Sequence, residues 1–196
     1  MKNLKNLMTL AIIFITISLS AQNYARIDPA FKKGRIDVQL GIGLTPTFIG
    51  EKATMTTPPL SMSIDWMASK KVSFGAYGSH SVTESRQDIF VDGLLGQWRN
   101  HYSEAGVRLG IHFTESEKWD FYGGLNLGVR HSKVEDMLEG MEQLNIYKGI
   151  KPVNTSMAYG GFVGARYAFK EKLVAFGEAG TGASLIKIGV GFRLAK

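Results

Sequence analysis

The sequence predicts an all-β fold, an eight-stranded antiparallel up-and-down transmembrane β-barrel. Segments in which apolar and polar residues alternate recur along the chain, and the connections between them are long and short in turn. Alternation over about ten residues is typical of a strand with one apolar and one polar face. Long loops at one end and short turns at the other are typical of a barrel that crosses an outer membrane, with the short turns in the periplasm.

The N-terminus is expected to be a secretory signal peptide. Lys2 and Lys5 precede a mostly apolar run that ends in small residues, with cleavage after Ala21 preferred to cleavage after Ser20. A transmembrane helix needs about 20 apolar residues, and this run is shorter. The predicted organisation is a signal peptide (1–21), an N-terminal periplasmic segment (22–33) and an outer-membrane β-barrel (34–196).

Eight segments carry the alternation, and an even number of strands places both termini at the periplasmic end. In the first segment Ile36, Val38 and Leu40 share one face, and Asp37 and Gln39 share the other. The other segments repeat this division between an apolar face and a face of charged residues, serine and glycine. The eight predicted strands are residues 34–44, 60–66, 72–79, 104–113, 119–130, 157–167, 173–180 and 186–194.

The seventh segment, 173–180, is the least regular. Glu178 shares its parity with Val174 and Phe176, so one of these side chains is expected to face the wrong side. The connection that follows, 181–185, is expected to be a short loop at the outer end. The other connections are long over 45–59, 83–98 and 133–154, and short over 68–71, 114–118 and 170–172.

Three observations favour an apolar outer surface over a soluble, lipocalin-like barrel with its apolar face around a ligand. The export signal delivers the chain to the right compartment. Glycine alternates with arginine on the polar faces, as in Gly106-x-Arg108-x-Gly110, and small neighbours make room for long side chains in a narrow lumen. Aromatic residues gather near the short turns, as in an interfacial girdle. These are Trp66, Phe74, Phe113, Trp119, Phe121, Tyr167, Phe169, Phe176 and Phe192.

On this assignment the charges that face the lumen nearly cancel. A barrel of eight strands has an interior just wide enough for side chains to fill it. A buried unpaired charge costs several kcal/mol, so ion pairing is expected. The predicted lumen is therefore filled and salt-bridged, with no open pore; the alternative is a proton or ion path through the same network. The network is Arg35, Asp37, Asp65, Glu104, Arg108, Asp120, Arg130, Arg166, Glu178, Lys187 and Arg193.

Two of the long loops contain apolar residues that an ordinary solvent-exposed loop lacks. They lie at 89–98 and at 134–144, and in the second the apolar residues have helical spacing. Such segments fold over the barrel mouth or rest on lipid headgroups. The alternative is a surface for an extracellular ligand or protein.

Residues 101–106 (HYSEAG) resemble the His-x-Ser stretch of the PagL-type lipid A deacylases, which are also eight-stranded barrels. The resemblance implies a nucleophile at Ser103 and its base at His101, which share one strand face, as such a pair needs. The acid of that family would fall at Glu115 or Glu117. Both lie in the opposite, periplasmic turn, so we expect no enzyme.

Other classes of site and partner find no support in the sequence. His80, His112 and His131 show no metal-ligand spacing, and the glycine-rich residues 177–182 lack the lysine and helix of a phosphate loop. We therefore expect no metal and no cofactor. The chain has no cysteine for a disulfide or a lipid anchor. Its net charge is +6, but without a run of basic and aromatic residues we expect no nucleic acid.

A broader resemblance covers most of the mature chain. The runs Arg108-x-Gly110-x-His112-Phe113 and Gly189-x-Gly191-Phe192-Arg193 are similar to the small outer-membrane β-barrel proteins of Bacteroidetes-type bacteria. The resemblance implies a place in the outer membrane, contact with its lipid and lipopolysaccharide, and insertion by the barrel-assembly machinery. It implies no shared catalytic residues.

The main functional hypothesis is a non-enzymatic outer-membrane barrel with a filled polar lumen. Its long extracellular loops would serve envelope structure, adhesion or the binding of a ligand or protein. Two alternatives remain at this point, a lipid A-modifying enzyme that uses His101 and Ser103, and a secreted lipocalin-like protein that binds a small apolar ligand.

Overall fold

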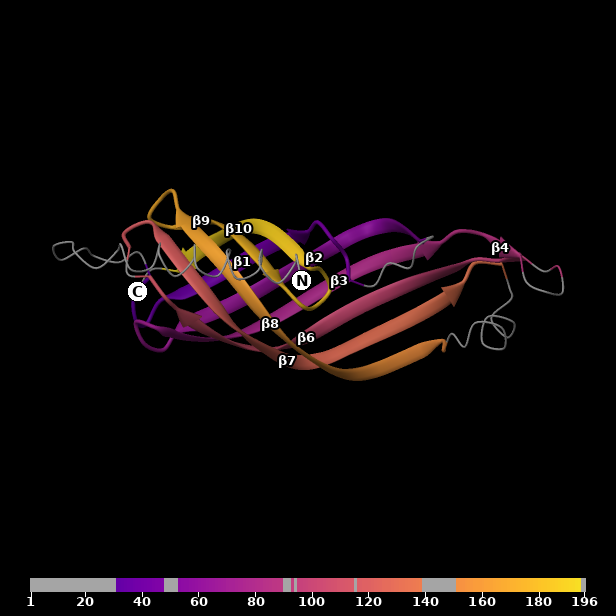
Figure 1. The fold of residues 1–196 in the computed structure, drawn as a ribbon, viewed down its shortest axis with the longest axis horizontal. Coiled ribbons are helices and arrows are strands. Elements are labelled where there is room, and N and C mark those ends of the chain that lie inside the picture. The colour runs from indigo at the N-terminus through magenta and orange to yellow at the C-terminus, as the bar shows by residue number, and fades with distance from the viewer. Residues whose placement is uncertain are drawn as a thin grey trace, which may run out of the picture.

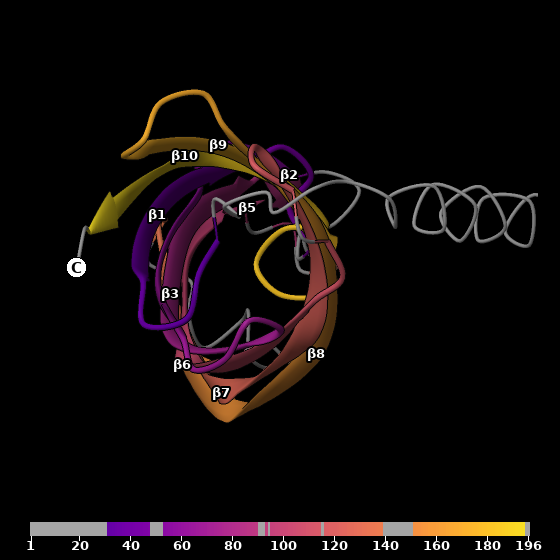
Figure 2. The same ribbon diagram turned by 90° about the vertical axis from the view of Figure 1, so that its left-hand side faces the viewer.

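The computed structural model describes residues 31–47, 53–89, 93, 95–114, 116–138 and 151–194. Eight long strands form a closed antiparallel barrel (Figures 1 and 2), with β1 next to β10 and then, in order, β9, β8, β7, β6, β3 and β2. They are β1 (Ile36–Gly43), β2 (Ala53–Met67), β3 (Val72–Ser85), β6 (Trp98–His112), β7 (Trp119–Asp136), β8 (Val153–Ala168), β9 (Leu173–Gly180) and β10 (Ile186–Leu194). The short strands β4 (Asp88–Ile89) and β5 (Leu95–Gly96) form a separate two-stranded sheet. The predicted eight-stranded all-β barrel is therefore confirmed.

The predicted signal peptide (1–21) and most of the predicted periplasmic segment (22–33) lie outside the described residues. Of the segment 22–33, residues 31–33 are described and lead directly into the barrel. In the described part of the chain, no helix is long and apolar enough to cross a membrane.

The two faces of each strand divide as the alternation predicts. On β7, the side chains of Leu125 and Val129 are 65% and 50% exposed, whereas Asp120 on the other face is completely buried. On β6, Val107 is 60% exposed and Arg108, its neighbour in sequence, is 4% exposed. Apolar side chains therefore form the outer surface of the barrel, and polar side chains fill its lumen.

The seventh predicted strand, β9, corrects the sequence prediction. Val174, Phe176 and Glu178 are all buried and all face the lumen, so none of the three faces the wrong side. Phe176 therefore does not belong to the outer aromatic girdle. Its ring occupies space left by glycine, because a Cβ atom at Gly41 or Gly189 would lie within 3 Å of it. The lumen at this level thus combines an apolar ring with charged groups, a mixture that parity alone does not predict.

The barrel wall is tall on one side and low on the other. Strands β2, β3, β6, β7 and β8 have 14 to 18 residues, whereas β1, β9 and β10 have 8 or 9. Figure 1 shows the longer strands running on well beyond β9 and β10. Parts of the predicted long connections 45–59, 83–98 and 133–154 are therefore strand. Cross-strand pairing explains the difference, since Thr83 still lies opposite Asn100 although neither continues the apolar pattern.

The connection from β9 to β10, residues 181–185, turns into the barrel instead of lying outside it. Figure 2 shows this yellow segment inside the ring of strands. Ala183 is buried, its carbonyl oxygen accepts a hydrogen bond from Thr47 N at 3.2 Å, and Ser184 bridges to Pro46. Gly182 has a φ of 146°, which a residue with a side chain rarely adopts. We call residues 181–185 the inner cap.

Candidate functional site

The lumen beside the short turns contains a layer of ion pairs centred on Arg166. Its Nη2 lies 2.7 Å from Asp120 Oδ2, and its Nη1 lies 3.2 Å from Asp37 Oδ2. Arg193 Nε lies 3.3 Å from the other oxygen of Asp37, and His112 Nδ1 lies 2.9 Å from Asp120 Oδ2. All five side chains are buried. Since an unpaired buried charge costs several kcal/mol, each charge here depends on its partners.

A second layer lies next to the first and is centred on Glu178. Arg108 Nη2 and Lys187 Nζ lie 2.6 and 2.5 Å from the two oxygens of this carboxylate. Tyr122 donates a hydrogen bond to Glu178 Oε1 at 2.8 Å, and Arg108 Nε lies 3.3 Å from Asp65 Oδ1. Arg108 on β6 and Glu178 on β9 are 70 residues apart in sequence, and they meet because the closed barrel directs both side chains into the same lumen.

Aromatic rings cover the guanidinium groups of these layers. The Arg166 guanidinium carbon lies 4.6 Å from the ring centres of both Phe31 and Tyr122, and that of Arg193 lies 4.4 Å from Phe31. Arg108 lies 4.2 Å from the ring of Phe162. Phe31 precedes β1 and was not predicted to enter the lumen. An aromatic residue outside any alternating segment gives no sequence signal for such a position.

The structure brings most of the predicted lumen network together in these two layers, but Glu104, Arg130 and Arg35 have other surroundings. Glu104 is buried and accepts hydrogen bonds from Tyr77 and Tyr102, at 2.8 and 2.6 Å. Arg130 donates to the backbone oxygen of Met157. Arg35 precedes β1 at the short-turn end. Sequence parity already placed His112 and Tyr122 on the polar faces, but their contacts with Asp120 and Glu178 are visible only in the structure.

Little empty space remains between the ion pairs and the inner cap. A cavity of about 50 Å³ is lined by Gln39, Glu104, Asn126 and Lys187 together with cap residues 181–184. It has room for a few water molecules, since one water needs roughly 10–15 Å³. Gln39 Oε1 and Asn126 Oδ1 have no partner among the described residues, so such water would satisfy them.

On the outer surface, polar residues form a row across four neighbouring strands, directly beyond the apolar surface. His80, Ser103, His131 and Thr155 lie opposite one another on β3, β6, β7 and β8. His80 Nδ1 lies 2.9 Å from Ser103 Oγ, and His131 Nδ1 lies 2.8 Å from Thr155 Oγ1. We call these four residues the polar row.

A cluster of three polar or charged side chains lies beyond the polar row, further towards the outer end of the barrel. Lys133 Nζ and His101 Nε2 lie 2.9 and 3.4 Å from the two carboxylate oxygens of Glu135. Glu135 extends beyond the apolar part of β7, and the hydrogen bond from Lys133 lowers the pKa of its carboxyl group. His101 is thus directed towards an acid that sequence reasoning did not connect with it.

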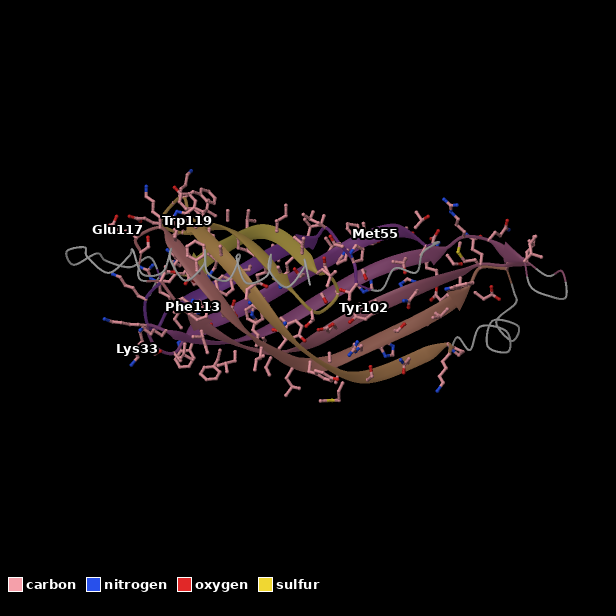
Figure 3. All side chains as sticks on the ribbon, in the orientation of Figure 1. Lys33, Met55, Tyr102, Phe113, Glu117 and Trp119 are labelled. Atoms are coloured by element: carbon pink, nitrogen blue, oxygen red, sulfur yellow. The ribbon has the colours of Figure 1, made fainter. Side chains whose placement is uncertain are left out.

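The predicted pair His101 and Ser103 shares the outward face of β6, as expected from parity. The hydrogen-bond partner of Ser103, however, is His80 from β3. Glu117 lies at the short-turn end in Figure 3, far from Tyr102, the residue between His101 and Ser103. Glu115 lies outside the described residues. The arrangement therefore contains a serine–histidine contact, but not the one that the sequence suggested.

Comparison with known proteins supports the fold. No protein-family model matches the chain, and no curated protein sequence matches it. The outer membrane protein OprG from Pseudomonas aeruginosa matches with a TM-score of 0.57 and 13% identity, over 86% of this chain and 100% of that one. Ail, the attachment invasion locus protein of Yersinia pestis, matches with a TM-score of 0.44 and 12% identity, over 83% and 99% of the two chains. The similarity to OprG shows that this chain has the fold of an eight-stranded outer-membrane β-barrel.

Proposed function

We propose that the protein is a barrel of the cell outer membrane, and the observation that carries this proposal is its apolar outer surface. On β7 the outward residues are apolar or glycine from Trp119 to Val129, where the polar row begins. Ten steps of about 3.3 Å on a strand tilted by about 40° span roughly 25 Å, the height of the apolar band of such barrels. Exposure of this surface to water would be unfavourable.

Aromatic residues at the short-turn end support a membrane orientation in which this end faces the periplasm. Figure 3 places Phe113 and Trp119 at the short-turn end, beside Lys33 and Glu117. The rings of Trp119 and Phe121 are stacked with centres 5.7 Å apart, and Tyr167 lies 4.8 Å from Trp119. Aromatic rings at one boundary of an apolar band are typical of a membrane interface. The short turns would then face the periplasm and the tall wall would face outward.

The function that we assign to this barrel is non-enzymatic. The buried ion pairs of the lumen and the inner cap support a filled lumen without an open pore. Activity would therefore reside in the outer end, where the tall wall and the connections between its strands meet the exterior. We propose that this end serves envelope structure or binds an extracellular ligand or protein.

The membrane and its machinery are the partners that this proposal requires. Outer-membrane lipid and lipopolysaccharide would cover the apolar surface, and the barrel-assembly machinery would insert a chain exported by the signal peptide at residues 1–21. A secreted, lipocalin-like binder of an apolar ligand is disfavoured, because the apolar faces point away from the lumen.

Fractionation and gel mobility test the proposal. The protein is expected in the outer-membrane fraction, with faster migration of the unboiled sample because a closed barrel resists detergent. A strain that carries an Arg166→Pro variant, in which strand pairing is broken, provides the unfolded control. Recovery of the wild-type protein in the soluble periplasm, with the same mobility before and after boiling, would refute the membrane assignment.

A second candidate function, hydrolysis of a lipid A acyl chain, is favoured by one observation. Ser103 Oγ lies 2.9 Å from His80 Nδ1 at the outer end of the apolar surface. A serine with a histidine base can attack an ester carbonyl. This candidate predicts that expression lowers the number of acyl chains on lipid A, as a mass spectrum would show, and that Ser103→Ala abolishes the change. Identical spectra with and without the protein would exclude it.

A further inference from the structure

The polar row ends the apolar surface abruptly on four strands at once. The outward neighbours on its inner side are Gly78, Ala105, Val129 and Met157, which also lie opposite one another on β3, β6, β7 and β8. One step further out on each strand, the residues become His80, Ser103, His131 and Thr155. In the proposed orientation this step falls at the headgroups of the outer leaflet.

The hydroxyl groups of the row orient the two imidazole rings. Ser103 and Thr155 each contact a histidine at Nδ1, at 2.9 and 2.8 Å. The contact at Nδ1 leaves Nε2 of His80 and His131 for a ligand, and both side chains are exposed. His101 lies next to them, with its ring centre 6.3 Å from that of His80.

The charge of this surface depends on its histidines. Arg99 on β6 pairs with Glu84 on β3 at 2.7 Å, and Lys133 pairs with Glu135 on β7 at 2.9 Å. The positive and negative charges within each pair cancel, and β8 contributes only the uncharged Thr155 to the row. Any positive charge on the rings of His80, His101 and His131 would therefore make this surface cationic.

We propose that His80, His101 and His131 bind the phosphate group of a lipid in the outer leaflet, and bind it more tightly when their rings carry positive charge. The acyl chains of such a lipid would lie on the apolar surface, around Val129 and Met157. Imidazolium and ammonium groups donate charge-assisted hydrogen bonds to phosphate oxygens. The inference depends on the proposed membrane location but not on what the external connections bind.

Acidification is expected to strengthen this binding. Histidine is the side chain whose charge ordinarily changes between pH 5 and pH 8, so a phosphate site built from histidines should bind more tightly at the acidic end of this range. Each added positive charge near an anionic lipid surface changes affinity roughly fivefold. Incomplete protonation reduces the combined effect, so we expect wild-type affinity to rise about tenfold or more over this interval.

Native mass spectrometry of the full chain in detergent micelles tests the proposal. The probes are bisphosphorylated lipid A, the same lipid after removal of its phosphates, and inorganic phosphate, each at pH 6 and pH 8. The test variant combines His80→Gln, His101→Gln and His131→Gln. The matched control is Lys118→Gln, which removes an exposed positive charge at the short-turn end. The heat-dependent gel shift confirms that every variant is folded.

The expected result is that bisphosphorylated lipid A binds wild type more tightly at pH 6, and that the triple variant loses this increase while Lys118→Gln retains it. The mass of the bound lipid should stay unchanged, which separates binding from hydrolysis of an acyl chain. Equal binding of the dephosphorylated lipid would overturn the proposal. Displacement of the lipid by an equal concentration of inorganic phosphate would overturn it too. Failure of the gel shift in wild type would instead refute the membrane location.

Discussion

Arg166 shows how a charged residue becomes part of the interior of a narrow barrel. Its side chain is almost completely buried and is shared by the carboxylates of Asp37 and Asp120 on two other strands. The rings of Phe31 and Tyr122 lie against its guanidinium group. A residue that meets two carboxylates and two rings fixes the relative positions of strands that are distant in sequence.

Replacement of Arg166 is expected to destabilise the barrel strongly. Arg166→Met keeps much of the side-chain volume but leaves Asp37 and Asp120 without their shared partner, and a broken buried ion pair typically costs about 3–5 kcal/mol. Urea unfolding in detergent, followed by the heat-dependent gel shift, measures the free energy of unfolding. Arg99→Met is the matched control, because its pair with Glu84 is partly open to solvent and should be worth only about 1 kcal/mol or less. Equal losses for the two variants would contradict a structural role for the buried layer.

At the scale of the strands, alternation predicts position and parity well but not length or internal packing. The strands follow their predicted apolar faces because the pleat of a strand directs successive side chains to opposite faces. In β8 the added residues Asn154, Thr155 and Ser156 pair with β7 although they are polar, and polar residues leave no hydrophobic signal. Phe176 and Phe31 lie in the lumen because residues distant in sequence leave room for their rings there, and alternation does not show such contacts. The contact of Ser103 with His80 depends on the register between β3 and β6, which a sequence does not show.

Glycines on β6 and β7 determine how closely these strands approach inside the barrel. A Cβ atom at Gly106 would clash with the backbone oxygen of Leu127 and lie 2.5 Å from the Cα of Gly128, and backbone cannot move aside easily. Gly106→Ala is therefore expected to cost about 1–3 kcal/mol of folding free energy. Gly177→Ala is the control, because nothing lies within 4 Å of its Cβ position, and it should change stability by less than about 0.5 kcal/mol. Urea unfolding compares them, and a neutral Gly106→Ala would show that the strands can separate.

The whole molecule combines a part at the short-turn end that all eight strands enclose with an asymmetric outer end. The ion-pair layers and the inner cap lie within the part that all eight strands surround, whereas only β2, β3, β6, β7 and β8 continue beyond it (Figure 1). The histidines of the polar row belong to this taller side. The buried ion pairs thus lie in the closed part of the barrel, and the outer surface of the taller wall carries the histidines of the proposed lipid site.

The filled lumen makes a prediction about conductance that separates its two barriers. Wild-type protein in planar lipid bilayers is expected to show no large, stable channels. A variant in which an Asn-Gly turn replaces the inner cap should remain closed, because the layer of Arg166, Asp37 and Asp120 still blocks the lumen. A further variant also replaces the four acids and four bases of both ion-pair layers by serine, so that no charge of a layer loses its partner and the variant should conduct. These residues are Asp37, Asp65, Asp120, Glu178, Arg108, Arg166, Lys187 and Arg193. Channels in the wild type, or opening by the shortened cap alone, would show that the ion-pair layer is not the barrier. The gel shift of each variant distinguishes a closed barrel from an unfolded one.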